Sequence, residues 1–289
     1  MSVEFINPEK LNKTIALSSG EQIKSIMSAL NSILGITHYC YIRSFPDGSH
    51  LLLSNDSSWI ESFYLDFYDH GVFHKIPDSY QSGHVLWSTL SDQTTFAACR
   101  ENFNIAHGIT LIEKQKEYCE FFCFGTTVDN IKIMDFYIYN LDLLKRFNAF
   151  FKERADKLIR EANADRIILP RCSITTSEEV ISSVPEGDFS QIRKNLIAAT
   201  QCKRYYLSGP FANVFLSPRQ LACLNLLTLG KSLKEIARVL NISPRTVETY
   251  LNIIKCKLGI QDRANLIINS LRYNQYIIRT EDDFFWLKG

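Results

Sequence analysis

The sequence predicts two domains of different class: an α/β/α sandwich on an antiparallel sheet over residues 1–165, and an all-α domain over 213–289. The chain has 289 residues, more than one domain usually needs. Helical and strand-like patterns alternate through the first part, whereas helix start signals follow one another in the last part. Residues 166–212 contain Pro170 and Pro185 as well as short strand-like and helical segments, which predicts a partly structured connector.

Each element of the first domain follows from a local pattern. Apolar residues at helical spacing predict helices, alternating ones predict strands, and Pro46-Asp47-Gly48 predicts a turn between two strands. Helices on both faces of an antiparallel sheet are typical of sensor domains, and the order is similar to that of PAS and GAF domains. The expected helices are 18–35, 59–69, 94–104 and 133–166, and the expected strands are 39–45, 50–55, 108–115 and 117–127.

Targeting and membrane signals do not stand out in the sequence. The segment MSVEFINPEKLNKT mixes charges and holds no apolar core, so we expect no secretory signal. No run of 18 apolar residues predicts a membrane span, which favours a cytoplasmic protein without a membrane partner. The eight cysteines are then expected to be small hydrophobic residues in a reducing compartment rather than disulfide partners.

The sequence gives little support to a metal site or to an enzyme active site. Cys119 and Cys123 form C-x3-C in a strand-like segment, and His70-x3-His74 lies beside Asp69, but neither pair has further ligands at zinc spacing. A phosphate-binding glycine loop, G-x-S-x-G and H-E-x-x-H are all missing from the sequence. We therefore predict no enzyme, no metal site and no cofactor.

Three helix starts follow one another in residues 216–258. Ser217 opens a capping box with Pro218 and Gln220, Ser232 opens a second box with Glu235, and Ser243 precedes a proline. Two short helices, a turn of about three residues, and then a longer third helix are the helix-turn-helix arrangement.

The third predicted helix has an apolar face and a polar face. Val247, Leu251, Ile254 and Leu258 share helical spacing and should face the core. The polar face offers hydrogen-bonding groups for base edges and lysines for phosphates, although a solvated face of a small helical bundle has the same pattern. The candidate DNA-binding residues are Arg245, Thr246, Glu248, Thr249, Asn252, Lys255 and Lys257.

The run LSPRQLACLNLLTLGKSLKEIARVLNISPRTVETYLNIIKCKLGIQDRANLI resembles the LuxR-type (GerE-type) helix-turn-helix domain over about 55 residues. The resemblance implies a transcription regulator that binds double-stranded DNA as a homodimer. It also implies a four-helix domain whose third helix enters the major groove and whose fourth, here starting at Asp262, supports dimerisation. Gln220 stands where the family usually has Glu, and Tyr250 where it often has His.

The charge distribution agrees with this expectation. Residues 211–289 hold 11 Lys and Arg against 6 Asp and Glu, a net +5, whereas 1–210 hold 21 against 25, a net −4. The net charge of +1 for the whole chain therefore conceals a basic C-terminal part, as attraction to phosphates requires.

Residues 15–165 resemble the autoinducer-binding domain of quorum-sensing receptors through Trp59, Phe63, Trp87 and the segment FAACRENFNIAHGITLI. In that family a Trp and an Asp hold the polar head of an acyl-homoserine lactone, which implies ligand-binding residues Trp59, Phe63, Tyr68, Asp69 and Trp87 here. This chain departs from the pattern, because Asp69 is displaced, no proline follows it, and Phe63 replaces the usual Tyr.

Two readings of the first domain follow. We expect a small apolar or amphipathic ligand, which need not be an acyl-homoserine lactone. The aromatic residues are alternatively ordinary core, and the domain is then a ligand-independent module for dimerisation or protein docking.

Overall fold

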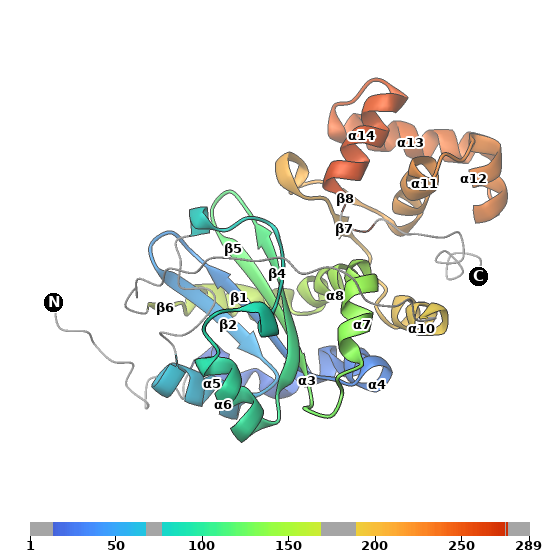
Figure 1. Cartoon of the computed structure of the whole chain (residues 1–289). Coiled ribbons are helices and arrows are strands. Elements are labelled where there is room, and N and C mark those ends of the chain that lie inside the picture. Colours follow the sequence, from blue (N-terminus) through green and yellow to red (C-terminus); the bar gives the residue numbers. More distant parts are fainter. Residues whose placement is uncertain (1–13, 68–76, 169–188, 275, 277–289) are drawn as a thin grey trace. The chain divides into compact units, whose positions relative to one another are not determined.

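The structure is a computed structural model that describes residues 14–67, 77–168, 189–274 and 276 (Figure 1). Contacts divide the chain into two compact units, Met1–Tyr139 with Arg154–Gly187, and Asn140–Glu153 with Asp188–Gly289. The first unit holds an antiparallel sheet with helices and the second a helical domain, so the predicted fold classes are confirmed. The functional division at 165 and 213 stays a prediction.

A six-stranded antiparallel sheet forms the centre of the first unit, in the order β3-β4-β5-β1-β2-β6. β4 and β5, which match the expected strands 108–115 and 117–127, form a hairpin in which the Gln115 N–H donates to the Tyr118 carbonyl. The strand at the β3 edge was not predicted. The bounds are β1 Ile36–Ser44, β2 Ser49–Ser54, β3 Gly83–Leu86, β4 Ala106–Lys114, β5 Cys119–Thr126 and β6 Ile167–Ile168.

The two faces of β1 carry different side chains, because successive residues of a strand point in opposite directions. His38, Cys40 and Ile42 share one face and line a cavity there, whereas Tyr39 and Tyr41 point to the other. All five are nearly inaccessible to solvent, so both faces of the strand are covered.

The predicted helix 18–35 is interrupted in the structure. Breaks at Ser19 and Met27 divide it into three pieces, and Ile23 and Leu30 are fully buried. The predicted helix 59–69 begins earlier and is described to residue 67, as α5 followed by the π-helical turn η1. The bounds are α2 Ile15–Ser18, α3 Gly20–Ile26, α4 Ser28–Leu34, α5 Ser57–Ser62, η1 Phe63–Phe67 and α6 Thr94–Phe103.

The long helix predicted over 133–166 consists of three helices, α7 Ile133–Tyr139, α8 Leu141–Arg154 and α9 Asp156–Ala164. The first break is at Asn140, whose buried side chain accepts a hydrogen bond from Arg193 Nη1 at 3.0 Å. The boundary thus coincides with a tertiary contact, and the sequence carries no proline or glycine there.

The described residues of the predicted connector include α10 Ser190–Ala199 and β7 Tyr205–Tyr206, both in the second unit. β7 pairs antiparallel with β8 Phe215–Leu216, which follows the connector. Tyr205 is fully buried, and its hydroxyl accepts a hydrogen bond from Arg146 Nη2 at 2.9 Å.

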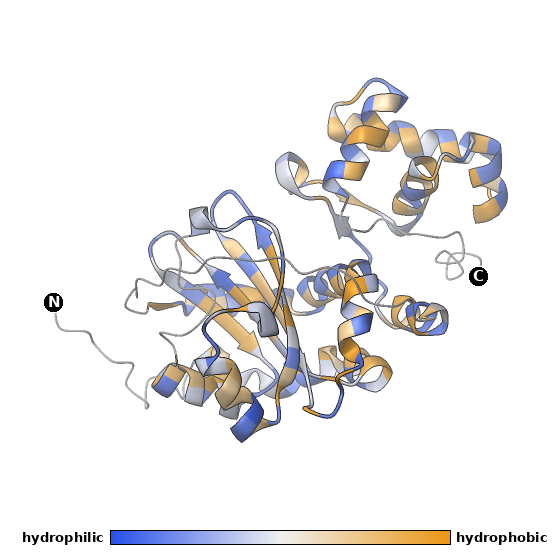
Figure 2. Ribbon diagram, viewed as in Figure 1, coloured by the Kyte–Doolittle hydropathy of each residue, from blue (hydrophilic) through white to orange (hydrophobic). Residues whose placement is uncertain are grey.

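Four helices complete the second unit, as expected: α11 Pro218–Thr228, α12 Leu233–Leu240, α13 Pro244–Leu258 and α14 Arg263–Tyr273. Both predicted capping boxes are present, at Ser217 and Ser232, and the side chains of Ser243 and Asp262 cap α13 and α14. Hydrophobic and hydrophilic residues alternate around these helices (Figure 2), as one buried face requires. Within the described ranges, no helix is long and apolar enough to cross a membrane.

Candidate functional site

Helix α13 is held against α12 and α11 by its apolar face. Val247, Leu251, Ile254 and Leu258 are all buried, which confirms the predicted core face. The turn between α12 and α13 begins with Asn241 in the left-handed region, at φ 52°, and ends at the cap Ser243. The geometry is that of a helix-turn-helix, with the other face of α13 open to solvent.

The predicted DNA-binding residues lie along that open face. Arg245, Glu248 and Asn252 are exposed and Lys255 is half-buried, and none of the four side chains contacts a hydrogen-bonding partner in the described part of the chain. Their donors and acceptors are therefore available to an external partner.

The two threonines of this face are already engaged. Thr246 Oγ1 lies 2.8 Å from the Ser243 hydroxyl, and Thr249 Oγ1 donates to the Arg245 carbonyl at 2.9 Å. Each hydroxyl oxygen keeps a lone pair that can still accept a hydrogen bond.

Lys257 differs from the other candidates, because its ammonium contacts the domain itself. Its Nζ donates to the Phe215 carbonyl at 2.7 Å and to Gln220 Oε1 at 3.2 Å, and it lies 4.6 Å from the centre of the Phe215 ring. The neutral Gln220 thus makes a hydrogen bond where a Glu would make an ion pair. Lys257 links α13 to α11 and to β8.

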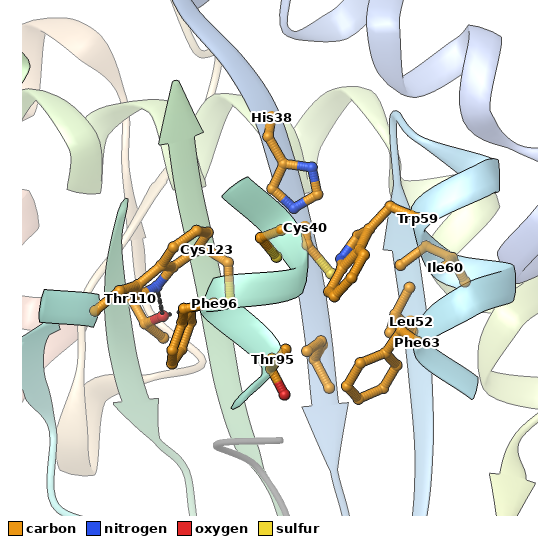
Figure 3. A pocket seen from close by; sticks show the side chains of 13 residues that line it. His38, Cys40, Leu52, Trp59, Ile60, Phe63, Thr95, Phe96, Thr110 and Cys123 are labelled. Atoms are coloured by element: carbon orange, nitrogen blue, oxygen red, sulfur yellow. Dashed lines mark hydrogen bonds between the residues drawn. The ribbon is translucent and has the colours of Figure 1, made fainter. Parts of the chain in front are cut away.

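A cavity of about 60 Å³ lies in the first unit between the sheet and the elements α5, η1 and α6 (Figure 3). Its walls are mostly aliphatic, aromatic and thiol side chains. The lining residues are His38, Cys40, Ile42, Leu52, Trp59, Ile60, Phe63, Trp87, Thr95, Phe96, Cys99, Thr110 and Cys123.

Three of the five predicted ligand-binding residues line this cavity: Trp59, Phe63 and Trp87. The other two, Tyr68 and Asp69, lie outside the described residues, as do His70 and His74. The Trp59 and Phe63 ring centres are 6.0 Å apart. Asp56 caps the start of α5, and its carboxylate accepts a hydrogen bond from the Trp59 backbone N–H at 3.0 Å.

The indole of Trp87 lies flat against the sheet because two glycines leave room for it. A Cβ on Gly108 would lie 2.1 Å from Trp87 Cδ2, and one on Gly125 would lie 3.2 Å from the same ring. Trp87 Nε1 donates to Thr110 Oγ1 at 2.9 Å, and Thr110 Oγ1 lies 3.5 Å from Cys123 Sγ (Figure 3). Glycine at these positions thus determines where this wall of the cavity stands.

The three thiols of the cavity are buried and uncharged at neutral pH. Burial raises the pKa of Cys99 to about 12 and that of Cys123 to about 11, and it also raises the pKa of Cys40. A protonated thiol is a poor nucleophile. These cysteines therefore act as soft apolar walls. Across the described residues, no group of three His, Cys, Asp or Glu could hold a metal ion.

Sequence reasoning missed the polar residues of the cavity wall, which are His38, Thr95 and Thr110. His38 is the one that can carry a charge. It is 3% exposed, and burial lowers the pKa of its imidazole to about 4, so the ring is neutral at physiological pH. Its Nδ1 is enclosed and has no hydrogen-bonding partner among the described residues. The alternation of His38, Cys40 and Ile42 was the available signal, because it places the histidine on the same face as two apolar residues.

Comparisons with known proteins cover different parts of the chain. Residues 214–269 match the family model of bacterial regulatory proteins, luxR family. No curated protein sequence matches the chain. A crystal structure of Escherichia coli SdiA is 13% identical, with 94% of this chain and 96% of that chain covered and a TM-score of 0.29. A structure of SdiA in complex with octanoyl-rac-glycerol is also 13% identical, with 91% of both chains covered and a TM-score of 0.30. Scores this low establish no shared ligand.

Proposed function

Because residues 214–269 form a DNA-binding domain of the luxR family of bacterial regulatory proteins, we propose that the chain is a transcription regulator acting on DNA in the cytoplasm. In this proposal α13 enters the major groove and reads base sequence, and a small molecule bound in the first unit controls the binding. The observation that carries the proposal is the row of exposed, unpartnered polar side chains on α13, within the basic part of the chain.

The residues of α13 take different roles. Arg245, Glu248 and Asn252 have side chains suited to base edges, and Thr246 and Thr249 offer acceptors close to the helix start. Lys255 contacts a phosphate, which adds affinity without sequence preference. Lys257 is assigned to the fold rather than to phosphate, since its ammonium already has two acceptors within the domain.

The cavity supports control by a ligand. A space of about 60 Å³ lined by apolar groups with a few polar atoms is typical of a binding site for a small, largely apolar molecule. A ligand can change DNA binding only if its affinity differs between two states of the protein. We assign Trp59, Phe63 and Trp87 to the cavity wall, and keep Tyr68 and Asp69 as candidates.

We further propose that the regulator acts as a homodimer, since two-fold symmetry matches a pseudo-palindromic site. Selection from a random duplex pool by the full chain tests both parts. The expected product is a symmetric motif with half-sites about 10 base pairs apart, or a multiple of that spacing. Recovery of no motif, or of an unchanged motif with Asn252→Ala and Arg245→Ala combined, would remove the role of α13.

The ligand is tested by mass spectrometry of an organic extract of the purified full chain. Cys99→Phe fills the cavity, whereas Cys256→Phe adds the same side chain at an exposed position and serves as the control. We expect a compound in the wild type and the control that is missing from Cys99→Phe. The same extract from all three would favour the alternative, a ligand-independent regulator whose first unit docks proteins.

A further inference from the structure

The basic part of the chain is followed by a short acidic segment. Residues 211–276 hold 9 Lys and Arg against 3 Asp and Glu, a net +6, whereas 277–289 hold 2 against 3, a net −1. Among the acids of 211–276, Glu235 and Asp262 already accept hydrogen bonds from backbone N–H groups at the starts of α12 and α14. The acids of the last segment are consecutive and are followed directly by three aromatic residues: Glu281, Asp282, Asp283, Phe284, Phe285 and Trp286.

The chain that leads from α14 to this segment is fixed on the domain. Asn274 Nδ2 donates to Asn225 Oδ1 at 2.6 Å, and Asn225 Nδ2 donates to the Tyr276 carbonyl at 2.8 Å. The Tyr276 backbone N–H donates to Asn274 Oδ1 at 3.0 Å, which closes a ring of three hydrogen bonds around residues that are nearly inaccessible to solvent. Because Asn225 belongs to α11, the segment 277–289, which lies outside the described residues, starts from a fixed position beside α11.

From this position the acidic residues are within reach of the open face of α13. α11 and α13 are in contact (Figure 1), and the axes of packed helices lie about 8–10 Å apart. The radius of α13 adds about 5–6 Å, so its open face lies about 15 Å from the axis of α11. Asp283 follows Tyr276 by seven residues, which span up to about 23 Å when extended. A tether this short gives the segment a local concentration on the order of millimolar at α13.

The open face of α13 combines cations with an apolar spot. Arg245 is exposed and Lys255 is half-buried, and neither side chain has a partner in the described part of the chain. Ile253 is 38% exposed and lies one helical turn before the exposed Cys256, on the same side of the helix. Carboxylates attract the cations, and aromatic rings remove the apolar pair from water and stack on a guanidinium. The surface therefore fits a segment in which acids precede aromatic residues.

We propose that residues 277–289 bind the open face of α13 when DNA is absent and compete with DNA for it. In this arrangement Glu281–Asp283 lie near the two cations, and Phe284–Trp286 cover Ile253 and Cys256. The inference rests on the proposed role of α13 in DNA binding. If the face is free in about a tenth to a fifth of the molecules, the apparent affinity for DNA is about 5- to 10-fold lower than that of a permanently open face.

Two variants of the full chain test the competition, by their dissociation constants for a short duplex of random sequence. The acid variant carries Glu281→Gln, Asp282→Asn and Asp283→Asn, and the aromatic variant carries Phe284→Ala, Phe285→Ala and Trp286→Ala. We expect both to bind about 5- to 10-fold more tightly than the wild type. The aromatic variant separates docking from long-range repulsion, because it keeps the net charge. A control with the same change of charge at exposed acids of the first unit should bind like the wild type; it carries Glu101→Gln, Glu117→Gln and Asp129→Asn.

Cys256 provides a second measurement that needs no DNA. It is the exposed cysteine among the described residues, and it lies on the face that the segment would cover. Its rate of alkylation by iodoacetamide is followed by mass spectrometry of the peptide that contains it. We expect Cys256 to react about 5- to 10-fold faster in the acid and aromatic variants than in the wild type, because the bound segment protects the thiol in the same fraction of molecules.

Two results would overturn the inference: an unchanged rate of Cys256 alkylation in both variants, or wild-type DNA affinity in the aromatic variant. Tighter DNA binding by the acid variant alone would show only long-range repulsion. In each of these cases, DNA binding by the wild type would leave the proposed role of α13 intact. Failure of every variant to bind DNA would instead refute that role, and the rate of Cys256 alkylation would then decide whether the segment binds α13.

Discussion

The cavity of the first unit and the open face of α13 both carry unpartnered polar groups, but the former are buried and the latter exposed. His38 is 3% exposed and its Nδ1 is enclosed, whereas Arg245 and Asn252 are open to solvent. In the cavity a missing hydrogen bond already costs free energy in the folded protein. On α13 water satisfies the groups until DNA replaces it, so their contribution appears only on binding and depends on salt. The buried groups of the cavity are therefore suited to selecting a small ligand, and the exposed groups of α13 to binding DNA.

The largest expected effect is a loss of stability at low pH, and it is caused by His38. Its folded pKa of about 4 lies below the ordinary value of 6.5, so its contribution to stability is complete above pH 6.5. As the pH falls from 6.5 to 4, the unfolded chain binds the proton first, and the free energy of unfolding should drop by about 3 kcal/mol. Burial dominates this shift over the opposing charge of Asp56, and the neighbouring thiols are protonated throughout.

Urea unfolding of the full chain at several pH values checks this prediction. His38→Leu should flatten the pH dependence of the unfolding free energy in that window. A wild-type curve that is parallel to the His38→Leu curve would show that the imidazole is not buried as described.

Gly108→Ala should destabilise the first unit by about 1–3 kcal/mol, since the new Cβ would lie 2.1 Å from Trp87 Cδ2 and the indole must move into the cavity. Gly83→Ala in β3 is the matched control, because a Cβ there meets nothing within 4 Å. Denaturant unfolding measures the stability of both variants. A small apolar molecule that binds in the cavity of the wild type should bind to Gly83→Ala but not to Gly108→Ala. An unchanged denaturant midpoint for Gly108→Ala would contradict the described position of the Trp87 indole against Gly108.

Asn252→Ala tests the reading face of α13. Loss of a base-edge hydrogen bond should lower discrimination at one base position about tenfold, with stability nearly unchanged because the side chain is exposed and unpartnered. Competition binding with single-base variants of the selected duplex measures this. Retention of the wild-type preference at every position would show that Asn252 does not contact a base.

The smallest expected effects come from alanine substitutions at Lys255 and Lys257. The two lysines lie two residues apart on α13 but differ in their contacts. Lys255→Ala should weaken binding to all sequences and reduce the slope of log affinity against log salt by about one unit. Lys257→Ala should leave that slope unchanged and lower stability by about 1 kcal/mol, since it loses the contacts with Phe215 and Gln220. If Lys257→Ala reduced the salt slope and Lys255→Ala left it unchanged, the phosphate contact would belong to Lys257.

Local signals made the second unit predictable to a large extent. The caps at Ser217, Ser232, Ser243 and Asp262 each place a hydrogen-bonding side chain at a fixed distance from a helix start, so the helices could be delimited without tertiary knowledge. The break at Asn140 could not be delimited in this way, because it depends on a contact with Arg193, some 50 residues away.

The cavity was predictable only in part. Trp59, Phe63 and Trp87 were found through a family resemblance, and all three lie in the cavity wall, whereas their binding of a ligand stays a prediction. His38 and the glycines under Trp87 were missed, since their role arises from strands brought together by the sheet, with Cys40 opposite Cys123. The sequence shows which face of β1 His38 shares, but not that its enclosed Nδ1 has no hydrogen-bonding partner among the described residues.

The central claim, that a ligand in the first unit controls DNA binding by α13, is tested most directly by the dissociation constant for the selected duplex. It is measured with the protein as purified, after organic extraction and refolding, and after the extract is returned. We expect a change of about 5- to 150-fold on extraction, reversal when the extract is returned, and no response in Cys99→Phe. The same dissociation constant in all three states of the wild type would contradict ligand control.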